Sequence, residues 1–139
     1  MKFLLDHNLP PVWAKGLNEF SANQFDSKSF SQVVALRDKF RHGTLDIEWL
    51  KALGEEGGWA VVSADFFRSK GNAEREMIRR QGLSVFVLNK AWHKSHTFWP
   101  RTAQLLLWWP EIVRQANSVQ ASAVEVPWKT SSKFIGLKL

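Results

Sequence analysis

Four short apolar runs, separated by segments with helical features, constrain the fold of this chain more than any other feature. The runs cover residues 2–5, 32–36, 59–63 and 83–88. The segments between them place apolar residues at helical spacing or carry helix-capping residues, and glycines follow two of them. Strands that alternate with helices predict an α/β fold, in which an open, largely parallel sheet has helices on both faces.

The pattern changes after about residue 98. Apolar residues around positions 105–113 predict further helix, and Pro110 predicts either a kink or a break between two helices. Two short runs, residues 123–128 and 134–139, are candidates for edge strands or a hairpin. A chain of 139 residues suits one ordinary domain. We therefore expect a single domain over 1–139, with a core of about 1–115 and a C-terminal extension over 116–139.

Composition excludes several classes of chemistry. The chain has no cysteine, so disulfides, zinc–thiolate clusters and a thiol nucleophile are ruled out. Its N-terminal apolar run is interrupted by Asp6 and lacks the apolar core of a signal peptide. No apolar run approaches the roughly 20 residues that a membrane helix needs. These features predict a cytoplasmic protein without a membrane partner.

Charge is distributed unevenly along the chain, whose formal net charge is +6. Residues 1–65 hold nine carboxylates and seven lysines or arginines, whereas residues 66–139 hold four and twelve. If the fold brings the two parts together, an acidic pocket would lie within a basic surface. Such an arrangement suits a metal site that acts on a polyanion, although a generic basic surface for solubility is an equal alternative.

Three aspartates fall at positions where parallel sheets bind ligands. Asp6 and Asp65 directly follow predicted strands, and Asp46 stands at the start of a predicted helix. Ligands bind beyond the carboxyl ends of such strands, and Mg²⁺ or Mn²⁺ prefers hard oxygen ligands. Converging carboxylates repel one another unless a cation neutralises them. The pattern predicts a metal site that activates water for attack on a phosphodiester, although each aspartate could instead cap a turn or helix.

Residues 3–10, 46–50 and 61–65 resemble the three acidic signatures of PIN-like domains, which include the VapC-type ribonuclease toxins. The resemblance spans about residues 1–115. It implies a three-layer fold with a central, mostly parallel sheet of about four strands flanked by helices. It also implies an endoribonuclease that depends on Mg²⁺ or Mn²⁺ and is the toxin of a type II toxin–antitoxin system.

The resemblance further implies a role for individual residues. Asp6, Asp46 and Asp65 would be both catalytic residues and metal ligands. Asn8 and Ser63 would orient these ligands. RNA would be the substrate and a small antitoxin protein a partner, and homodimers are common among proteins that this chain resembles.

The chain departs from the family pattern at two places. Many relatives of this subgroup have Glu directly after the first Asp, where this chain has His7, and a second Asp after the third motif, where it has Phe66 and Phe67. Glu48 and Glu74 are alternative candidates for a fourth metal ligand, and either could equally be an exposed helix residue. His7 could contact an RNA phosphate or donate a proton.

Basic residues follow the third acidic motif closely enough to flank its crevice. The candidates for phosphate contact are Arg68, Lys70, Arg75, Arg79 and Arg80. A solvated helix face is the alternative interpretation.

The chain contains eight tryptophans. Trp49 and Trp59 are expected in the core. Trp92, Trp99, Trp108 and Trp109 could also pack in the core, or could stack on unpaired bases or bury a partner's helix.

Two other functions remain open on the sequence alone. The missing acidic residues beside the first and third motifs also suit a catalytically reduced PIN-like module that binds RNA or a protein partner. A third interpretation is a hydrolase of nucleotides or phosphate esters that uses the same pocket.

Overall fold

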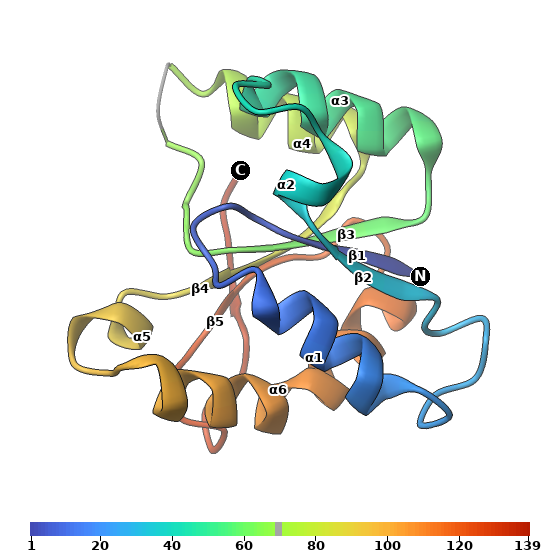
Figure 1. Ribbon diagram of the computed structural model, residues 1–139. Coiled ribbons are helices and arrows are strands. Elements are labelled where there is room, and N and C mark those ends of the chain that lie inside the picture. Colours follow the sequence, from blue (N-terminus) through green and yellow to red (C-terminus); the bar gives the residue numbers. More distant parts are fainter. Residues whose placement is uncertain (69–70) are drawn as a thin grey trace.

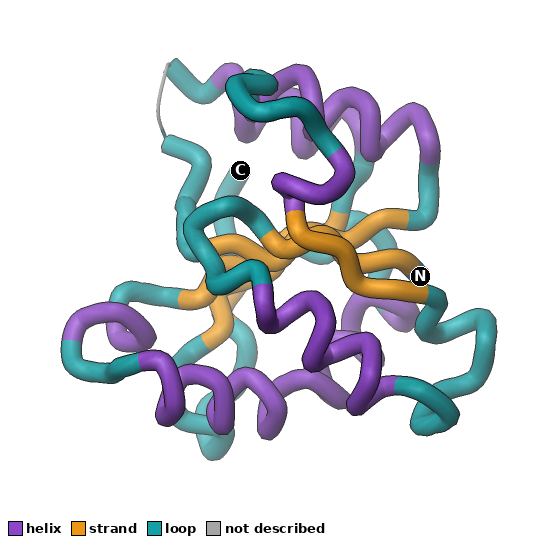
Figure 2. The backbone as a smooth tube through the Cα atoms, viewed as in Figure 1, coloured by secondary structure: helices purple, strands orange, loops and turns teal. Residues whose placement is uncertain are grey.

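A computed structural model describes residues 1–68 and 71–139 of the chain. Its centre is a six-stranded sheet with the order β2-β1-β3-β4-β5-β6 (Figures 1 and 2). The strands are β1 (Lys2–Leu5), β2 (Gln32–Ala35), β3 (Trp59–Ser63), β4 (Ser84–Leu88), β5 (Ala123–Val126) and β6 (Ile135–Gly136). The first five run parallel, and β6 pairs antiparallel with β5.

Helices cover both faces of the sheet, which makes three layers (Figure 1). The helices are α1 (Val12–Ser21), α2 (Leu36–Lys39), α3 (Asp46–Glu56), α4 (Ala73–Gln81), α5 (Ala91–Lys94) and α6 (Phe98–Ser118). α2, α3 and α4 lie on one face, and α1, α5 and α6 lie on the other (Figure 1). The predicted α/β class, with a mostly parallel sheet between helices, is confirmed.

Alternation of side chains along the strands divides the core in two. In β1, Phe3 and Leu5 pack into the cluster that includes α1 and α6, whereas Leu4 packs into the cluster that includes α3 and α4. Every residue of β3 and β4 is buried. Strands buried on both faces are expected to be continuous apolar runs, and this explains why the sequence revealed them clearly.

The helices α3 and α4 approach each other closely at Gly54. A Cβ atom added at Gly54 would collide with the side chain of Gln81, including its own Cβ atom. The absence of a side chain at position 54 therefore sets how near the two helices lie.

The sheet is larger than the predicted four strands. The two C-terminal runs form β5, which extends the parallel sheet beside β4, and the short β6. These two consecutive strands pair antiparallel, so the segment forms the predicted hairpin, and of the two only β6 is an edge strand. The second strand is shorter than predicted, because the chain turns into α2 directly after Ala35.

The helix α6 runs unbroken through Pro110, so the predicted break into two helices is wrong, and the alternative, a kink, stays a prediction. Pro110 is exposed, while Trp109 and Ile112 on either side of it are buried in the core. This packing stabilises the helix despite the lost backbone donor. Among the described residues, no helix has both the length and the apolar character required to span a bilayer.

Most of the tryptophans belong to the core. Trp49 and Trp59 are buried as predicted, and buried positions also hold Trp13, Trp92, Trp108 and Trp109. Trp99 differs, because 77% of its surface is exposed. Core packing is therefore the correct interpretation for three of the four later tryptophans that the sequence left open.

Candidate metal centre

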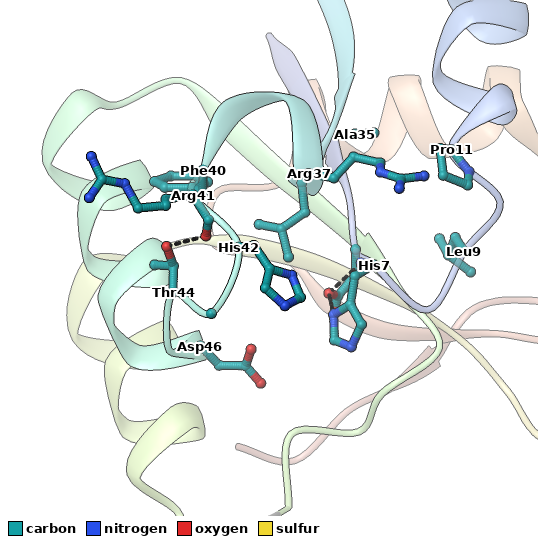
Figure 3. A pocket seen from close by; sticks show the side chains of 13 residues that line it. His7, Leu9, Pro11, Ala35, Arg37, Phe40, Arg41, His42, Thr44 and Asp46 are labelled. Atoms are coloured by element: carbon teal, nitrogen blue, oxygen red, sulfur yellow. Dashed lines mark hydrogen bonds and ion pairs between the residues drawn. The ribbon is translucent and has the colours of Figure 1, made fainter.

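A pocket of about 720 Å³ opens beyond the carboxyl ends of β1 and β2 (Figure 3). Its lining comes from the segment after β1 and from the segment between β2 and α3, and it includes Asp6 and Asp46. β3 ends at the same edge because it pairs in parallel with β1. This edge is where an open α/β sheet binds its ligands.

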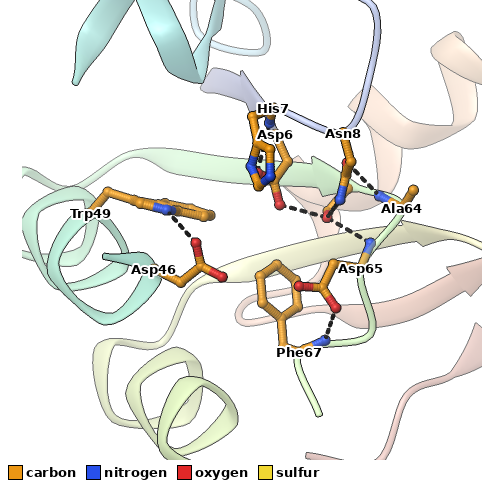
Figure 4. Close-up of polar contacts among 9 residues, drawn as sticks. Asp6, His7, Asn8, Asp46, Trp49, Ala64, Asp65 and Phe67 are labelled. Carbon is orange, nitrogen blue, oxygen red and sulfur yellow. Dashed lines mark hydrogen bonds and ion pairs between the residues drawn. The ribbon is translucent and has the colours of Figure 1, made fainter. Parts of the chain in front are cut away.

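Three carboxylates meet beside this pocket. Asp46, Asp65 and Glu74 each offer one oxygen atom, and these atoms lie within 4.8 Å of one another. Asp46 is the first residue of α3, Asp65 follows β3, and Glu74 lies in the first turn of α4. Figure 4 shows the carboxylates of Asp46 and Asp65 pointing toward each other. The starts of two helices and the segment after a strand thus bring three acidic side chains together.

This group of oxygens has the chemistry of a divalent cation site. Glu74 is 3% exposed, and Asp46 and Asp65 are partly buried. Like charges at such separations in a partly desolvated site repel one another, and a cation removes that repulsion. Hard oxygen donors suit Mg²⁺ or Mn²⁺. The residues present therefore fit such an ion.

Asp6 lies next to this group, although it is not a member of it (Figure 4). Its carboxylate is 2% exposed. It accepts hydrogen bonds from Ser63 Oγ at 2.8 Å and from the backbone N–H of His7 at 2.7 Å, and His7 Nδ1 lies 2.9 Å from it. Burial raises the pKa of Asp6 above its ordinary value, and the hydrogen bonds from Ser63 and His7 oppose this effect.

Ser63 connects the ends of β1 and β3. While it donates to Asp6, its Oγ accepts hydrogen bonds from the backbone N–H of Asp65 at 2.9 Å and from Asn8 Nδ2 at 3.4 Å. Asn8 Oδ1 in turn accepts from the backbone N–H of Ala64 at 3.1 Å. Ser63 and Asn8 thus have the contacts that the predicted orienting role requires.

Two aromatic residues that the sequence did not assign to the site hold the other carboxylates. Trp49 Nε1 donates to Asp46 Oδ1 at 3.0 Å, and the backbone N–H of Phe67 donates to Asp65 Oδ1 at 2.9 Å. The Trp49 and Phe67 rings pack edge to face, with centroids 6.4 Å apart. The sequence signal was the pair Phe66–Phe67, which stands where the resemblance implies a second Asp. Of this pair, Phe67 is buried.

The two candidates for a further ligand differ in their surroundings. Glu74 belongs to the three-carboxylate group, whereas Glu48 is exposed and lies outside it. His7 has 68% of its side chain exposed and lines the pocket.

The predicted basic residues after the third motif have several different partners. Arg75 donates to the carbonyl oxygens of Phe66 and Lys138, and Arg79 donates to the carbonyl of Leu139 and to Glu76. Arg80 lies 3.6 Å from Glu76, and Arg68 lies over the Phe66 ring. Lys70 is outside the described residues. Phosphate contact by this group stays a prediction, and Arg75 in particular fastens the C-terminal residues to α4.

The family model for the PIN-like domain matches residues 1–90, and the chain belongs to this family. The match covers β1 to β4 and all the acidic residues considered above. Comparisons with curated proteins and with solved structures gave no significant match.

Proposed function

We propose that this protein is an endoribonuclease that depends on Mg²⁺ or Mn²⁺. The observation that carries the proposal is the grouping of Asp46, Asp65 and Glu74 at the carboxyl edge of the sheet, in a chain of the PIN-like family. RNA is the proposed substrate, and hydrolysis of a phosphodiester is the proposed reaction.

The residues of the site have distinct proposed tasks. Asp46, Asp65 and Glu74 hold the cation, and Asp6 adds negative charge from beside them. When bound, the cation supplies Lewis-acid stabilisation of the phosphoryl oxygens and activation of water. Ser63 fixes Asp6 and the backbone of Asp65, so that neither has to reorganise when the substrate binds.

The experiment that tests the proposal is a cleavage assay with purified protein and single-stranded RNA. Cleavage is expected with Mg²⁺ or Mn²⁺ and not with chelator. Asp65→Asn is expected to lose about 100-fold or more in rate, because metal catalysis contributes several kcal/mol. Asp38→Asn is the matched control, since Asp38 is an exposed aspartate of α2. Equal rates for wild type and Asp65→Asn would contradict the proposal.

A catalytically reduced module that binds RNA or a protein is the alternative. The observation that favours it is the pair of substitutions at His7 and Phe66–Phe67, which removes carboxylates that relatives use. Titration with Mn²⁺ followed by calorimetry separates the two: metal binding without RNA cleavage would favour the reduced module. Cleavage that requires metal would exclude it.

The role as a toxin is a separate proposal that rests on the VapC-like resemblance. Induced expression in a bacterial host is expected to arrest growth, and Asp65→Asn is expected to relieve the arrest. A small antitoxin protein that covers the pocket is the proposed partner, and the cytoplasm is the proposed location. Growth arrest of equal strength with Asp65→Asn would separate toxicity from the site.

A homodimer is also proposed, in keeping with the resemblance. The exposed Trp99 of α6 is the candidate interface tryptophan, since Trp92, Trp108 and Trp109 are used in the core. Light scattering on the purified protein measures its mass, and a Trp99→Ala protein of unchanged dimeric mass would remove this residue from the interface.

A further inference from the structure

The pocket beside the carboxylates has its own chemistry. Its walls are the segment after β1, which contributes His7, Leu9 and Pro11, and residues 35–37 and 40–44, at the end of β2 and before α3. Asp6 and Asp46 also line it, which places the carboxylate group at its border. A volume of about 720 Å³ lies within the range of roughly 300–1,000 Å³ that is typical of ligand pockets.

The pocket combines an apolar base with cationic or ionisable side chains. Leu9 and Ala35 are buried in the core below it. His7 and His42 point into the pocket, and the guanidinium group of Arg37 extends toward Pro11 (Figure 3). An aromatic or apolar surface next to cationic groups is the combination that single-stranded nucleic acids bind, by stacking and by charge.

Arg37 and Arg41, which both line the pocket, differ from the lysines Lys2 and Lys39 in their partners. Lys39 and Lys2 form ion pairs with Glu56, at 3.0 and 3.3 Å. In the ranges 1–68 and 71–139, Arg37 forms no ion pair, and it is exposed. Its planar guanidinium group can therefore bind a phosphate with two hydrogen bonds without first giving up a carboxylate.

The arrangement of charge in the pocket favours binding of a single-stranded nucleic acid over binding of a mononucleotide. One end of the pocket carries carboxylates, where a phosphate needs a cation, and another part carries Arg37, which binds a phosphate directly. A ligand with several phosphates along one backbone can satisfy both places at once. The bases of an unpaired strand are also free to contact Phe40 and the imidazole of His42.

We propose that this pocket binds the single-stranded RNA substrate next to the scissile phosphodiester, with Arg37 contacting a backbone phosphate and His42 contacting the same strand. This inference rests on the proposed ribonuclease function and deepens it. It places the substrate-binding basic residues before α3, in addition to the residues that follow the third acidic motif.

The test measures binding separately from cleavage. A short fluorescent single-stranded oligoribonucleotide is titrated with protein in chelator, and anisotropy is recorded over a series of salt concentrations. Arg37→Ala is expected to weaken binding about tenfold, as for loss of a charged hydrogen bond. The slope of log affinity against log salt is expected to fall by about 0.7, as for one lost phosphate contact on a single strand.

Matched variants separate a specific contact from net charge. Arg114→Ala removes the same charge from α6, on the other face of the sheet, and is expected to bind RNA as the wild type does. Arg37→Lys is expected to bind with intermediate affinity, because it keeps the charge and loses the bidentate geometry. His42→Ala is expected to weaken binding, because it removes the imidazole ring that contacts the strand.

Three results would overturn the inference. The wild type does not bind the RNA, or Arg37→Ala and Arg114→Ala lose equal amounts of RNA affinity. The third is that adenosine monophosphate binds as tightly as the RNA, which would make the pocket a mononucleotide site. A different result would contradict the proposed ribonuclease function: the protein binds RNA in a way that depends on Arg37, but it does not cleave RNA when metal is added.

Discussion

The helices on the two faces of the sheet contribute different kinds of residue. On one face, α6 and α1 supply tryptophans to the core, and a hydrogen bond links the two helices: Trp109 Nε1 donates to Ser21 Oγ at 2.9 Å. On the other face, α3 and α4 bury fewer large residues but begin with Asp46 and Glu74. One face therefore provides most of the aromatic core, and the other provides the carboxylates.

The difference follows from how a parallel sheet is connected. A helix that links parallel strands starts near the carboxyl end of the strand before it, so its first turn lies at the ligand-binding edge. Carboxylates are also stabilised in the first turn by the helix dipole. α1 starts at this edge too, but its entry carries Pro11 and no acidic residue in the first turn. Residue type in the first turn thus decides which helix contributes to the metal centre.

The largest expected effect on stability comes from the aromatic face. Trp109→Ala should lower the free energy of unfolding by about 3–5 kcal/mol, because it removes a buried ring and leaves a cavity. Urea denaturation measures this change. Trp99→Ala is the control, and its exposed ring predicts a small effect. Similar losses for both variants would show that the buried ring of Trp109 stabilises the protein no more than an exposed ring of the same helix does.

The next largest effect on stability is expected at the carboxylates on the face of the sheet that carries α3 and α4. Mn²⁺ at about 100 times its Kd should stabilise the wild type by about 2.7 kcal/mol. Glu74→Gln should lose most of this increment, whereas Glu48→Gln should keep it, because only Glu74 belongs to the carboxylate group. Thermal unfolding with Mn²⁺ and with chelator measures this stabilisation for each variant. A reversed ranking would make Glu48 the ligand.

Ser63→Ala should reduce cleavage activity and metal affinity by about 10- to 100-fold, as expected when a residue that orients metal ligands is removed. Ser84→Ala is the matched control, because Ser84, like Ser63, is a buried serine in a strand. Ser84 begins β4, and its Oγ accepts a hydrogen bond from the backbone N–H of Ser122. Metal titration and initial rates measure the effect. If both variants behave alike, Ser63 has no specific link to the site.

The smallest expected effect is on stability at acid pH, and it arises at Glu56, the last residue of α3. Hydrogen bonds from Lys39, then Trp59 and Lys2, lower the pKa of Glu56 from 4.5 to about 2. A lowered pKa in the folded state stabilises the protein above about pH 4.5, and this contribution disappears as the pH falls toward 2. The stability difference between wild type and Glu56→Gln should therefore shrink over that range in acid denaturation. A difference that is constant with pH would contradict the assignment.

The sequence predicted the sheet well where strands are buried on both faces. β3 and β4 are continuous apolar runs, and the positions of Asp6 and Asp65 followed from where the runs end. β5 and β6 were ambiguous because they are short, and strand pairing depends on contacts that are distant in sequence. A break at Pro110, one of the two predicted effects of this residue, does not occur, because tertiary packing outweighs the local cost of a proline.

The site was harder to predict than the fold. Sequence could name Asp46, Glu48 and Glu74 but could not rank the two glutamates, because their separation from Asp65 depends on how α3 and α4 pack. It also gave no reason to select Arg37, whose proposed role rests on where its guanidinium group lies in the pocket. Local pattern identifies which residue types are available, and tertiary geometry determines which of them meet.

The close approach of α3 and α4 at Gly54 has a consequence for the substitutions that this helix pair tolerates. Gly54 and Gln81 lie near the C-terminal ends of the two helices, away from Asp46 and Glu74, which lie in their first turns. A larger residue at position 54 would have to displace Gln81 or push the helices apart. Gly54→Ala is therefore expected to lower the free energy of unfolding by about 1–3 kcal/mol.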